Sequence, residues 1–467
     1  GCWKRKVRGQ GITGVNISTP SQRWDWSATR SSPSSRMSSS ALTSIPDTGL
    51  MREAQPEARG RRQKGRTEAK SSEDSERMTR DVAFNFQGLL RLTYKSLFKS
   101  RGTNYRLTGK RVVLLLIAYP AYLLLELVTW LGLSLDEIFF RGYRDIEIRQ
   151  PVYIVGNPRS GTTFLQRLLA RDEATFNSMR TWEMLLAPSI TMRKAFWALS
   201  RLDRRLGGPV HRLLGMLEES WQEDNVVHRI AIRAPEEDEY LLTHIFSSLK
   251  IWLYTAMVEE AVPYTYFDSR MPQEDKRRIM GFYKRCVQRH LYAHGDSDLH
   301  YLAKNPHFSP MVDALYEHLP GAKIIYLARN PLDMIPSYIS LKENEWQLLG
   351  NPVEEYGSRD YILDMAEHWY TYPLERLEQA PKDSYIIVNF DDLVTSARET
   401  VREIYDRFGL ELSPAFDEIL RQAAERARDH DSDHEYSLHE MGLTREQIVT
   451  RYRNVFERFG FDTRGGE

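Results

Sequence analysis

Short apolar runs alternate with segments of helical period through most of the chain after residue 149. Three runs, at 152–156, 323–328 and 385–390, are the length of buried strands and end at glycine or are followed by polar residues. Around them, apolar residues recur every three or four positions, which predicts helices at 236–247, 273–292, 309–319, 331–342 and 357–378, and across the charged region 396–460. This alternation predicts an α/β fold, a P-loop-type parallel sheet with helices on both of its faces.

The first 148 residues follow different patterns. Residues 1–80 are rich in serine and in basic residues and carry no apolar period, which predicts a disordered tail without a role in the chemistry. Residues 81–148 combine a basic flank with the apolar run Val112–Leu133, which is long enough to cross a bilayer. The remainder, 149–465, is predicted to be one α/β domain.

The apolar run allows two arrangements in a membrane. Pro120 and Glu126 interrupt it and favour an interfacial helix docked on the domain, whereas its length allows a transmembrane helix. If the helix spans, the basic flank stays on the cytosolic side and the domain lies across the membrane. We expect membrane association in both cases, as a single-pass protein of the Golgi or another endomembrane or at a cytosolic membrane face.

The composition argues against a nucleic-acid partner and against a disulfide framework. The chain carries 64 Lys and Arg against 64 Asp and Glu, a formal net charge of zero, so a nucleic-acid partner is not expected. The two cysteines, Cys2 and Cys286, lie far apart in the chain, so a disulfide framework is not expected either.

One stretch has the pattern of a phosphate-binding loop. The sequence "VYIVGNPRSGTTFLQ" consists of a strand, a loop flanked by Gly156 and Gly161, and the start of a helix. The backbone N–H groups of 160–163 would point at an anion, and two threonine hydroxyls and Arg159 add further donors. An ATP or GTP loop has lysine where Thr162 stands, so the pattern disfavours phosphate transfer from a magnesium nucleotide.

The stretch "NPRSGTTFLQRLL" resembles the donor-binding loop of sulfotransferases that use 3′-phosphoadenosine-5′-phosphosulfate (PAPS). It is most similar to the branch that includes protein-tyrosine sulfotransferases and bacterial relatives. The resemblance implies PAPS as the co-substrate and 3′-phosphoadenosine-5′-phosphate as the product. It also implies that the 5′-phosphosulfate is bound by Arg159, Ser160, Gly161, Thr162 and Thr163.

Two further blocks support the resemblance. The block "KIIYLARNPLDMIPSYISL" is similar to the family's 3′-phosphate-binding strand and helix, which implies that Arg329 and Ser337 bind this phosphate. An arginine at a strand end and a serine one to two turns into the next helix can face the same crevice. The block "LHYLAKNPHFSP" resembles the family's stretch before that strand, and it implies that Lys304 stabilises charge on the leaving phosphate.

Three candidates remain open for the catalytic base. Glu183 lies 24 residues after Arg159, where the tyrosine-type branch carries a catalytic glutamate, and it is the first choice. His307, three residues after Lys304, is the rival, because cytosolic sulfotransferases carry a histidine at the comparable place. The acidic run Glu236–Glu239 is the third candidate, and such a run more often opens a helix.

The expected function is transfer of a sulfuryl group from PAPS to a hydroxyl or amine of a small-molecule, lipid or glycan acceptor, in a scheme that requires no metal. A P-loop kinase or NTPase is the alternative enzyme. Asp391 and Asp392 would have to bind its magnesium, but they are expected to precede a helix that begins near Thr395. A non-catalytic, membrane-anchored phosphate-binding module is the third possibility, and the presence of Lys304 and Arg329 disfavours it.

Overall fold

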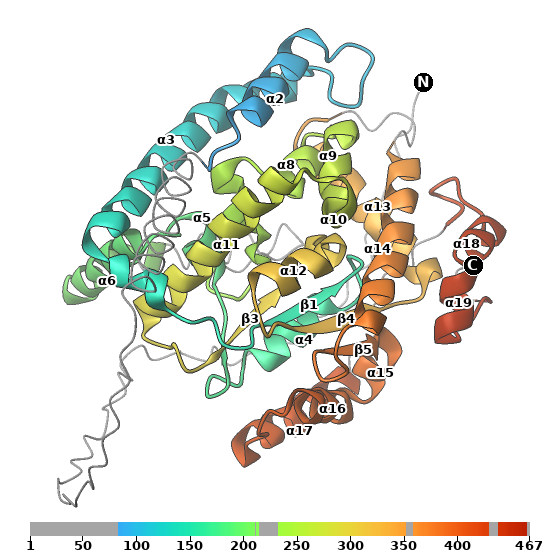
Figure 1. The fold of residues 1–467 in the computed structure, drawn as a ribbon. Helices are drawn as coiled ribbons and strands as arrows, with labels where there is room; N and C mark the ends of the chain where they lie inside the picture. Colours follow the sequence, from blue (N-terminus) through green and yellow to red (C-terminus); the bar gives the residue numbers. More distant parts are fainter. Residues whose placement is uncertain (1–82, 211, 214–231, 352–357, 429–437, 465–467) are drawn as a thin grey trace, which may run out of the picture. The chain divides into compact units, whose positions relative to one another are not determined.

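The computed structural model describes residues 83–210, 212–213, 232–351, 358–428 and 438–464. All of them belong to one unit of the chain, Ser72–Glu467 (Figure 1). The tail that is predicted to be disordered, 1–80, lies outside the described residues.

Five parallel strands form the central sheet. Its order is β2-β3-β1-β4-β5, and its strands are β1 (Val152–Gly156), β2 (Phe176–Asn177), β3 (His300–Lys304), β4 (Lys323–Ala328) and β5 (Tyr385–Asn389). The chain places β2 and β3 on one side of β1 and β4 and β5 on the other. The carboxyl end of β1 is therefore the switch point at which open α/β sheets bind ligands.

Strand side chains alternate between two buried faces. On β1, Tyr153 and Val155 belong to one core, and Val152 and Ile154 belong to the other. The first core is completed by α11 (Gln273–His294), α12 (Val312–His318), α13 (Pro331–Leu348) and α14 (Arg359–Gln379). The second is completed by α4 (Thr162–Leu169), α15 (Phe390–Thr395), α16 (Ala397–Phe408) and α17 (Pro414–Arg428), and Figure 1 shows α16 and α17 on the far side of the sheet from α12.

Short elements complete the first core. These are α5 (Thr181–Leu185), the 3-10 helices η2 (Asp238–Ile245) and η3 (Pro306–Met311), and α8 (Leu249–Tyr254), α9 (Val258–Thr265) and α10 (Phe267–Arg270). The C-terminal helices α18 (Arg445–Arg451) and α19 (Arg453–Phe459) follow, and Tyr452 donates a hydrogen bond to the Leu363 carbonyl of α14.

The predicted α/β fold is confirmed, but local details differ. β3 was not among the predicted strands, because its outer positions are polar and only three apolar residues lie in it. The predicted helix 236–247 is the 3-10 helix η2, and 309–319 is divided between η3 and α12. Asp391 and Asp392 lie inside the first turn of α15, which begins five residues before the predicted start.

The apolar helix α3 (Gly109–Phe139) extends beyond the predicted run at both ends, and η1 (Arg141–Asp145) connects it toward β1. Among the described residues it is the one helix long and apolar enough to cross a membrane, judged by length and composition. In Figure 1 it runs along one side of the domain, with α2 (Phe86–Phe98) beside its N-terminal part and α6 (Ile190–Arg205) near its C-terminal part. Its acidic residues Glu126 and Asp136 are buried against the domain.

Asp136 ties α3 to two other helices. Its carboxylate accepts hydrogen bonds from the backbone N–H groups of Ile190 and Thr191, both at 2.8 Å, and from Arg289 Nε at 3.2 Å. We expect Asp136→Ala to lower the free energy of unfolding by about 3 kcal/mol, because buried donors lose their acceptor. Urea unfolding measures this. Glu147→Ala, at an exposed carboxylate, should cost less than about 0.5 kcal/mol, and an equally small loss for Asp136→Ala would contradict the anchoring role.

Candidate active site

The two glycines of the loop are required by packing inside the protein. Gly156 ends β1 with φ +140°, and a Cβ there would lie 2.3 Å from the carbonyl oxygen of Leu327 on β4. Gly161 has φ +81°, and a Cβ there would lie 2.7 Å from the Phe390 ring of α15. Neighbouring parts of the protein occupy the space beside both glycines, so a side chain at either position would collide with them.

Between the glycines, the loop is held in a strained conformation. Arg159 has φ +66°, a left-handed conformation that costs a non-glycine residue on the order of 1–3 kcal/mol and that clusters at functional sites. Ser309 of η3 fixes the start of the loop, because its Oγ accepts from the N–H of Gly156 and donates to its carbonyl, both at 2.9 Å.

Arg159, Arg329 and Ser337, which the sequence assigned to two phosphates, lie together. Arg159 Nε donates to Ser337 Oγ at 2.9 Å, and Arg329 Nη1 donates to the Arg159 carbonyl at 2.8 Å. The Arg329 guanidinium lies 4.3 Å from the centre of the Phe390 ring. Burial lowers the pKa of Arg329, so a bound anion would compensate for the hydration that its charge has lost.

Several donors of this region have no partner among the residues that the structure describes. The Nε of Arg329 and the Oγ of Ser160 are buried without a hydrogen bond. Gly161 precedes α4 and gives it no side-chain cap, so the N–H groups of Thr162 and Thr163 in its first turn are available to a ligand. A positive end of a helix, an arginine and an orphaned hydroxyl around one loop fit the binding of an anion.

Lys304 ends β3 beside the loop strand β1, and two carboxylates hold it. Its Nζ donates to Glu236 Oε1 at 3.1 Å and to Glu237 Oε1 at 3.0 Å. Glu237 also pairs with Lys250 of α8. Burial alone would raise the pKa of Glu237, but Lys250 and Lys304 outweigh burial and hold the pKa well below its usual range.

His307 lies in η3, a turn beyond Lys304. Its Nδ1 is 2.7 Å from Glu239 Oε2, and Ser248 Oγ donates to the other carboxylate oxygen at 2.6 Å. Burial would raise the pKa of Glu239, but His307, together with Lys250 and Ser248, outweighs burial and lowers it. Glu239 therefore fixes the ring and leaves Nε2 as the nitrogen that can meet a substrate proton.

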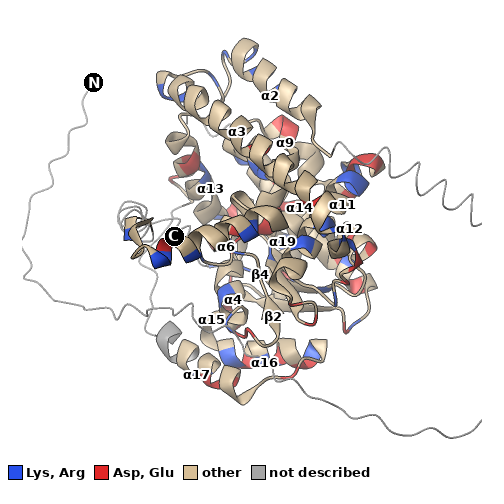
Figure 2. Cartoon of the chain, turned by 90° about the vertical axis from the view of Figure 1, so that its left-hand side faces the viewer, with Lys and Arg blue, Asp and Glu red and all other residues tan. Residues whose placement is uncertain are grey.

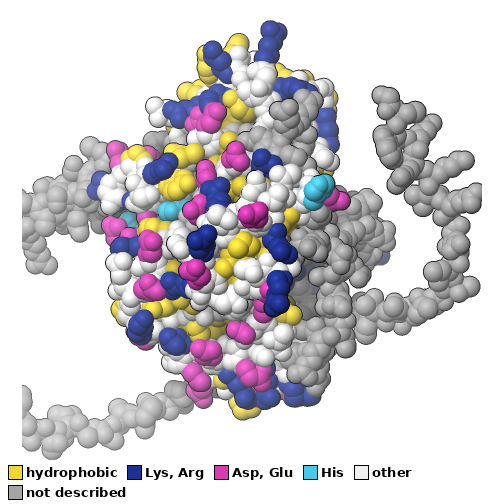
Figure 3. Space-filling view, turned by 90° about the vertical axis from the view of Figure 1, so that its right-hand side faces the viewer, with side chains coloured by type: hydrophobic (Ala, Val, Ile, Leu, Met, Phe, Trp, Pro, Cys, Tyr) yellow, Lys and Arg dark blue, Asp and Glu magenta, His cyan; other side chains and the backbone are white. Residues whose placement is uncertain are grey.

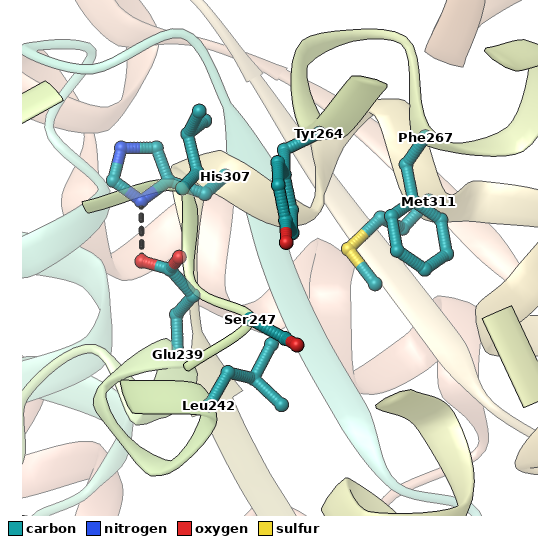
Figure 4. A pocket seen from close by; sticks show the side chains of 8 residues that line it. Glu239, Leu242, Ser247, Tyr264, Phe267, His307 and Met311 are labelled. Atoms are coloured by element: carbon teal, nitrogen blue, oxygen red, sulfur yellow. Dashed lines mark hydrogen bonds and ion pairs between the residues drawn. The ribbon is translucent and has the colours of Figure 1, made fainter. Parts of the chain in front are cut away.

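A small cavity adjoins this pair (Figure 4). Apart from Glu239 and His307, its lining is apolar or weakly polar and comes from η2, α8, α9, α10 and η3, with the residues Leu242, Ser247, Leu249, Tyr264, Phe267 and Met311. In Figure 4 the Glu239 carboxylate and the His307 ring lie on one side of it, opposite Phe267 and Met311. Of the candidates for the base, His307 and Glu239 of the acidic run both line this cavity.

Glu183, the first choice for the base, lies in a different cluster. It is 1% exposed, accepts from the Arg180 N–H at 2.8 Å, and lies 2.7 Å from His294 Nε2. Burial would raise the pKa of Glu183, but Arg193 and His294 hold it well below its usual range. A carboxylate stabilised in this way is a weak proton acceptor.

The Glu183 cluster has the residue types of a metal site. Oxygen and nitrogen atoms of Glu183, His290 and His294 lie within 4.8 Å of one another. Both ring nitrogens of His290 are already engaged, one with Arg193 at 2.6 Å and the other with Asn177. Burial and Arg193 lower the pKa of His290 well below its usual range, and the histidine acts as a neutral bridge between these two side chains.

Sequence reasoning missed several partners. Ser309, Lys250 and Phe390 carry no local signal, because they contact the site only through tertiary packing. The acidic run Glu236–Glu239 did carry a signal, since four adjacent carboxylates are unusual. How deeply each carboxylate is buried depends on side chains that are distant in the sequence.

Comparison with known proteins agrees with this geometry. Residues 151–414, more than half of the chain, match the sulfotransferase family. The chain belongs to the sulfotransferase family. The match contains the loop, Lys304, His307, Arg329 and Ser337.

Individual relatives of this sulfotransferase are distant. The omega-hydroxy-beta-dihydromenaquinone-9 sulfotransferase Stf3 of Mycobacterium bovis is 23% identical over 346 residues, which cover 71% of this chain and 81% of the relative. The crystal structure of STF1 from Mycobacterium tuberculosis has a TM-score of 0.56 at 21% identity and covers 82% of this chain and 97% of its own. STF9 from Mycobacterium avium has the same TM-score at 19% identity, with 71% and 82% covered. These structures establish the sulfotransferase fold.

Asp238 makes the free energy of unfolding depend on pH. It accepts from the buried hydroxyls of Tyr283 and Tyr301 and from Asn305 Nδ2, and burial raises its pKa to about 6. The folded protein therefore keeps this proton at a pH at which the unfolded chain, with a pKa near its ordinary 3.8, has released it.

We expect the free energy of unfolding to fall by up to about 3 kcal/mol between pH 4 and pH 6 through Asp238 alone, because the folded state binds the extra proton. This stability is complete below the unfolded pKa and is lost as pH rises through the folded pKa. In Asp238→Asn this fall should disappear from urea unfolding curves measured across that range. Asp360→Asn, at an exposed aspartate of α14, should keep the wild-type profile, and the same profile in Asp238→Asn would contradict the assignment.

Proposed function

We propose that this sulfotransferase transfers the sulfuryl group of PAPS to a hydroxyl of an apolar, lipid-class acceptor. The observation that carries the proposal is the meeting of Arg159, Arg329 and Ser337 beside a loop whose buried donors have no partner. The absence of a lysine at Thr162 separates the loop from those of magnesium-dependent kinases.

The donor would lie along the carboxyl edge of the sheet. Arg159, Ser160, Gly161, Thr162 and Thr163 would bind its 5′-phosphosulfate through side chains and the N–H groups of the α4 N-terminus. The 3′-phosphate would be held by Arg329 and Ser337, which form one continuous set of donors with the loop. PAPS supplies the activated sulfuryl group when it is bound.

The remaining site residues serve the transfer itself. The acceptor oxygen forms a bond to sulfur while the bond from sulfur to the bridging phosphate oxygen breaks, and the bond electrons leave with the phosphate. Lys304 uses two of its three N–H donors on Glu236 and Glu237 and keeps one for this oxygen. The acceptor proton goes to a base within hydrogen-bond reach.

We assign the base to His307, with Glu239 as the residue that positions it. Histidine is the side chain that most often serves as a general base, and Glu239 on Nδ1 leaves the Nε2 of His307 for this task. Glu183, Glu237 and Glu239 are all held ionised with depressed pKa values, and each is therefore a weaker base. His307 also lines the apolar cavity, whereas Glu183 and Glu237 do not.

Two observations support a lipid-class acceptor. The cavity beside His307 is lined mainly by aliphatic and aromatic side chains, and an apolar lining selects apolar ligands. The relative Stf3 is named for a hydroxylated menaquinone derivative, which is an isoprenoid lipid carrying a terminal hydroxyl.

Donor class can be tested by thermal unfolding. We expect adenosine 3′,5′-bisphosphate without magnesium to stabilise the protein by about 2.7 kcal/mol at a hundredfold excess over its Kd, because it binds only the folded state. The gain should be lost in Arg329→Ala. It should be kept in Arg398→Ala, because Arg398 of α16 forms an ion pair with Asp417 of α17. Stabilisation by magnesium-ATP in place of the bisphosphate would contradict the proposal.

The base can be tested by the kinetics of transfer from labelled PAPS to a long-chain alcohol in detergent micelles. We expect His307→Ala to lower kcat between about a hundredfold and ten-thousandfold, with stabilisation by the bisphosphate unchanged. Glu239→Gln should cause a smaller loss of kcat, because it affects only the orientation of the ring. Glu183→Gln keeps the size of the side chain and one acceptor oxygen for the Arg180 N–H, and its kcat should remain near wild type. The reverse order of effects would return the base to Glu183.

A further inference from the structure

The outer face of α3 presents a continuous stripe of large aliphatic side chains. Ile117, Leu124, Leu131 and Ile138 follow one another at intervals of seven residues, and their exposed fractions lie between 59% and 66%. This spacing keeps side chains on one side of a helix, over a length of roughly 30 Å. An apolar surface of this length is rare on a soluble protein and marks an interaction site.

The opposite face of α3 is attached to the domain at its beginning, middle and end. At the beginning, Thr108 Oγ1 donates to the Gly350 carbonyl at 2.8 Å. In the middle, Glu126 Oε1 lies 2.8 Å from His244 Nδ1 of η2. At the end, Asp136 binds the N-terminus of α6.

The first and the last of these contacts are about 40 Å apart along the helix axis. A helix attached to one domain at both ends and in its middle cannot cross a bilayer unless the domain enters the hydrocarbon with it. That arrangement would bury the many charged groups of the domain in lipid. The contacts therefore place α3 parallel to a membrane surface.

The helices beside α3 extend the same face. α2 is connected to it through Thr93 Oγ1 and Tyr119 OH, 2.5 Å apart, and exposes Leu90 and Phe98. α6 exposes Leu199 within the helix, and the exposed Leu206 directly follows its end. Figure 2 shows α2 and α3 almost without charged residues, whereas Figure 3 shows a face of the domain on which both charges are interspersed.

Charge at the border of this face identifies the occupant. Exposed basic residues follow α2 and lie on α6, among them Lys99, Arg101, Arg201 and Arg205, whereas the acidic residues of α3 and α6 are buried or half-buried. Anionic lipid headgroups match such a border. A second copy of the chain meeting this face by two-fold symmetry would bring basic residues against one another.

We propose that the outer faces of α2, α3 and α6 form one membrane-docking surface that inserts into a single leaflet of an anionic bilayer, with α3 lying in the membrane plane. Tyr122 of α3 donates to the Thr243 carbonyl of η2 at 2.9 Å, and η2 also carries Leu242 and Glu239 of the cavity. Where the proposed function holds, docking through the membrane-docking surface places the site beside the leaflet that holds its lipid acceptor.

Depth measurements test the orientation of α3. In the full-length protein with Cys2→Ser, the variants Val113→Cys, Leu124→Cys and Ile138→Cys would each carry an environment-sensitive fluorophore, and Cys286 is buried. The probe is a vesicle of phosphatidylcholine and phosphatidylglycerol that contains lipids with quenchers at different depths. We expect equal, shallow depths at all three positions. A deep Leu124 between two shallow ends would overturn the proposal in favour of a spanning helix.

Affinity measurements test the surface itself. We expect Leu127→Glu, at a side chain 68% exposed on α3, to lower the vesicle-bound fraction at least about tenfold, because an apolar side chain is lost and a charge must enter the headgroup region. Val394→Glu, at an exposed valine of α15, adds the same charge and should leave binding unchanged. Both variants should keep the circular dichroism spectrum and the unfolding temperature of the wild type, which shows that they are folded.

The alternatives have distinct outcomes. Vesicle binding that is equal in Leu127→Glu and Val394→Glu would overturn the proposal. Labels on α3 that become shielded only at high protein concentration, together with a doubled mass, would also overturn it, because they would show that a second copy of the chain covers this face. Vesicle binding requires no donor, so a failure of the PAPS assignment would leave these results as they are. A failure of vesicle binding would likewise leave the donor test unaffected.

Discussion

Four consecutive carboxylates, Glu236–Glu239, are held in the interior of this protein, and the rest of the site is arranged around the need to compensate them. An ionised group loses several kcal/mol of hydration when it is buried without a partner. Lys304 and Lys250 compensate the first two carboxylates, tyrosine hydroxyls bind Asp238, and His307 binds Glu239. The partners come from β3, α8, α11 and η3, so these elements must meet in one arrangement before the carboxylates can be buried.

The same segment connects the site to the apolar side of the domain. On one side of η2, Glu239 orients His307 beside the cavity. On its other side, His244 binds Glu126 of α3, and its carbonyl accepts a hydrogen bond from Trp130 Nε1 at 3.1 Å. An acidic residue inside an apolar helix, which would be costly in a bilayer, has a purpose here because it attaches the helix to the domain. The proposed membrane-docking surface and the proposed catalytic base are thus joined through one short 3-10 helix.

Sequence alone could predict the parts of this structure that depend on local pattern. The strand, loop and helix around Gly156, the Arg329 and Ser337 spacing, and the apolar α3 are all determined by residues close together in the chain, and the structure contains each of them. The partners of Lys304 could not be predicted in the same way, because Glu236 is 68 residues away in the chain. Glu183 illustrates the limit, since its distance from Arg159 in the sequence matches the family, whereas its contacts are determined by Arg193 and His294.

The most direct measurement is a double-mutant cycle between Lys304 and Glu237, with turnover of labelled PAPS as the readout. If the buried carboxylates and the lysine act as one unit at the donor, Lys304→Met should remove most of the activity. Glu237→Gln should lower the activity of the wild type strongly, but it should add little further loss to the Lys304→Met variant. Independent effects that multiply in the double variant would contradict the account, because Lys304 and Glu237 would then act on the reaction separately.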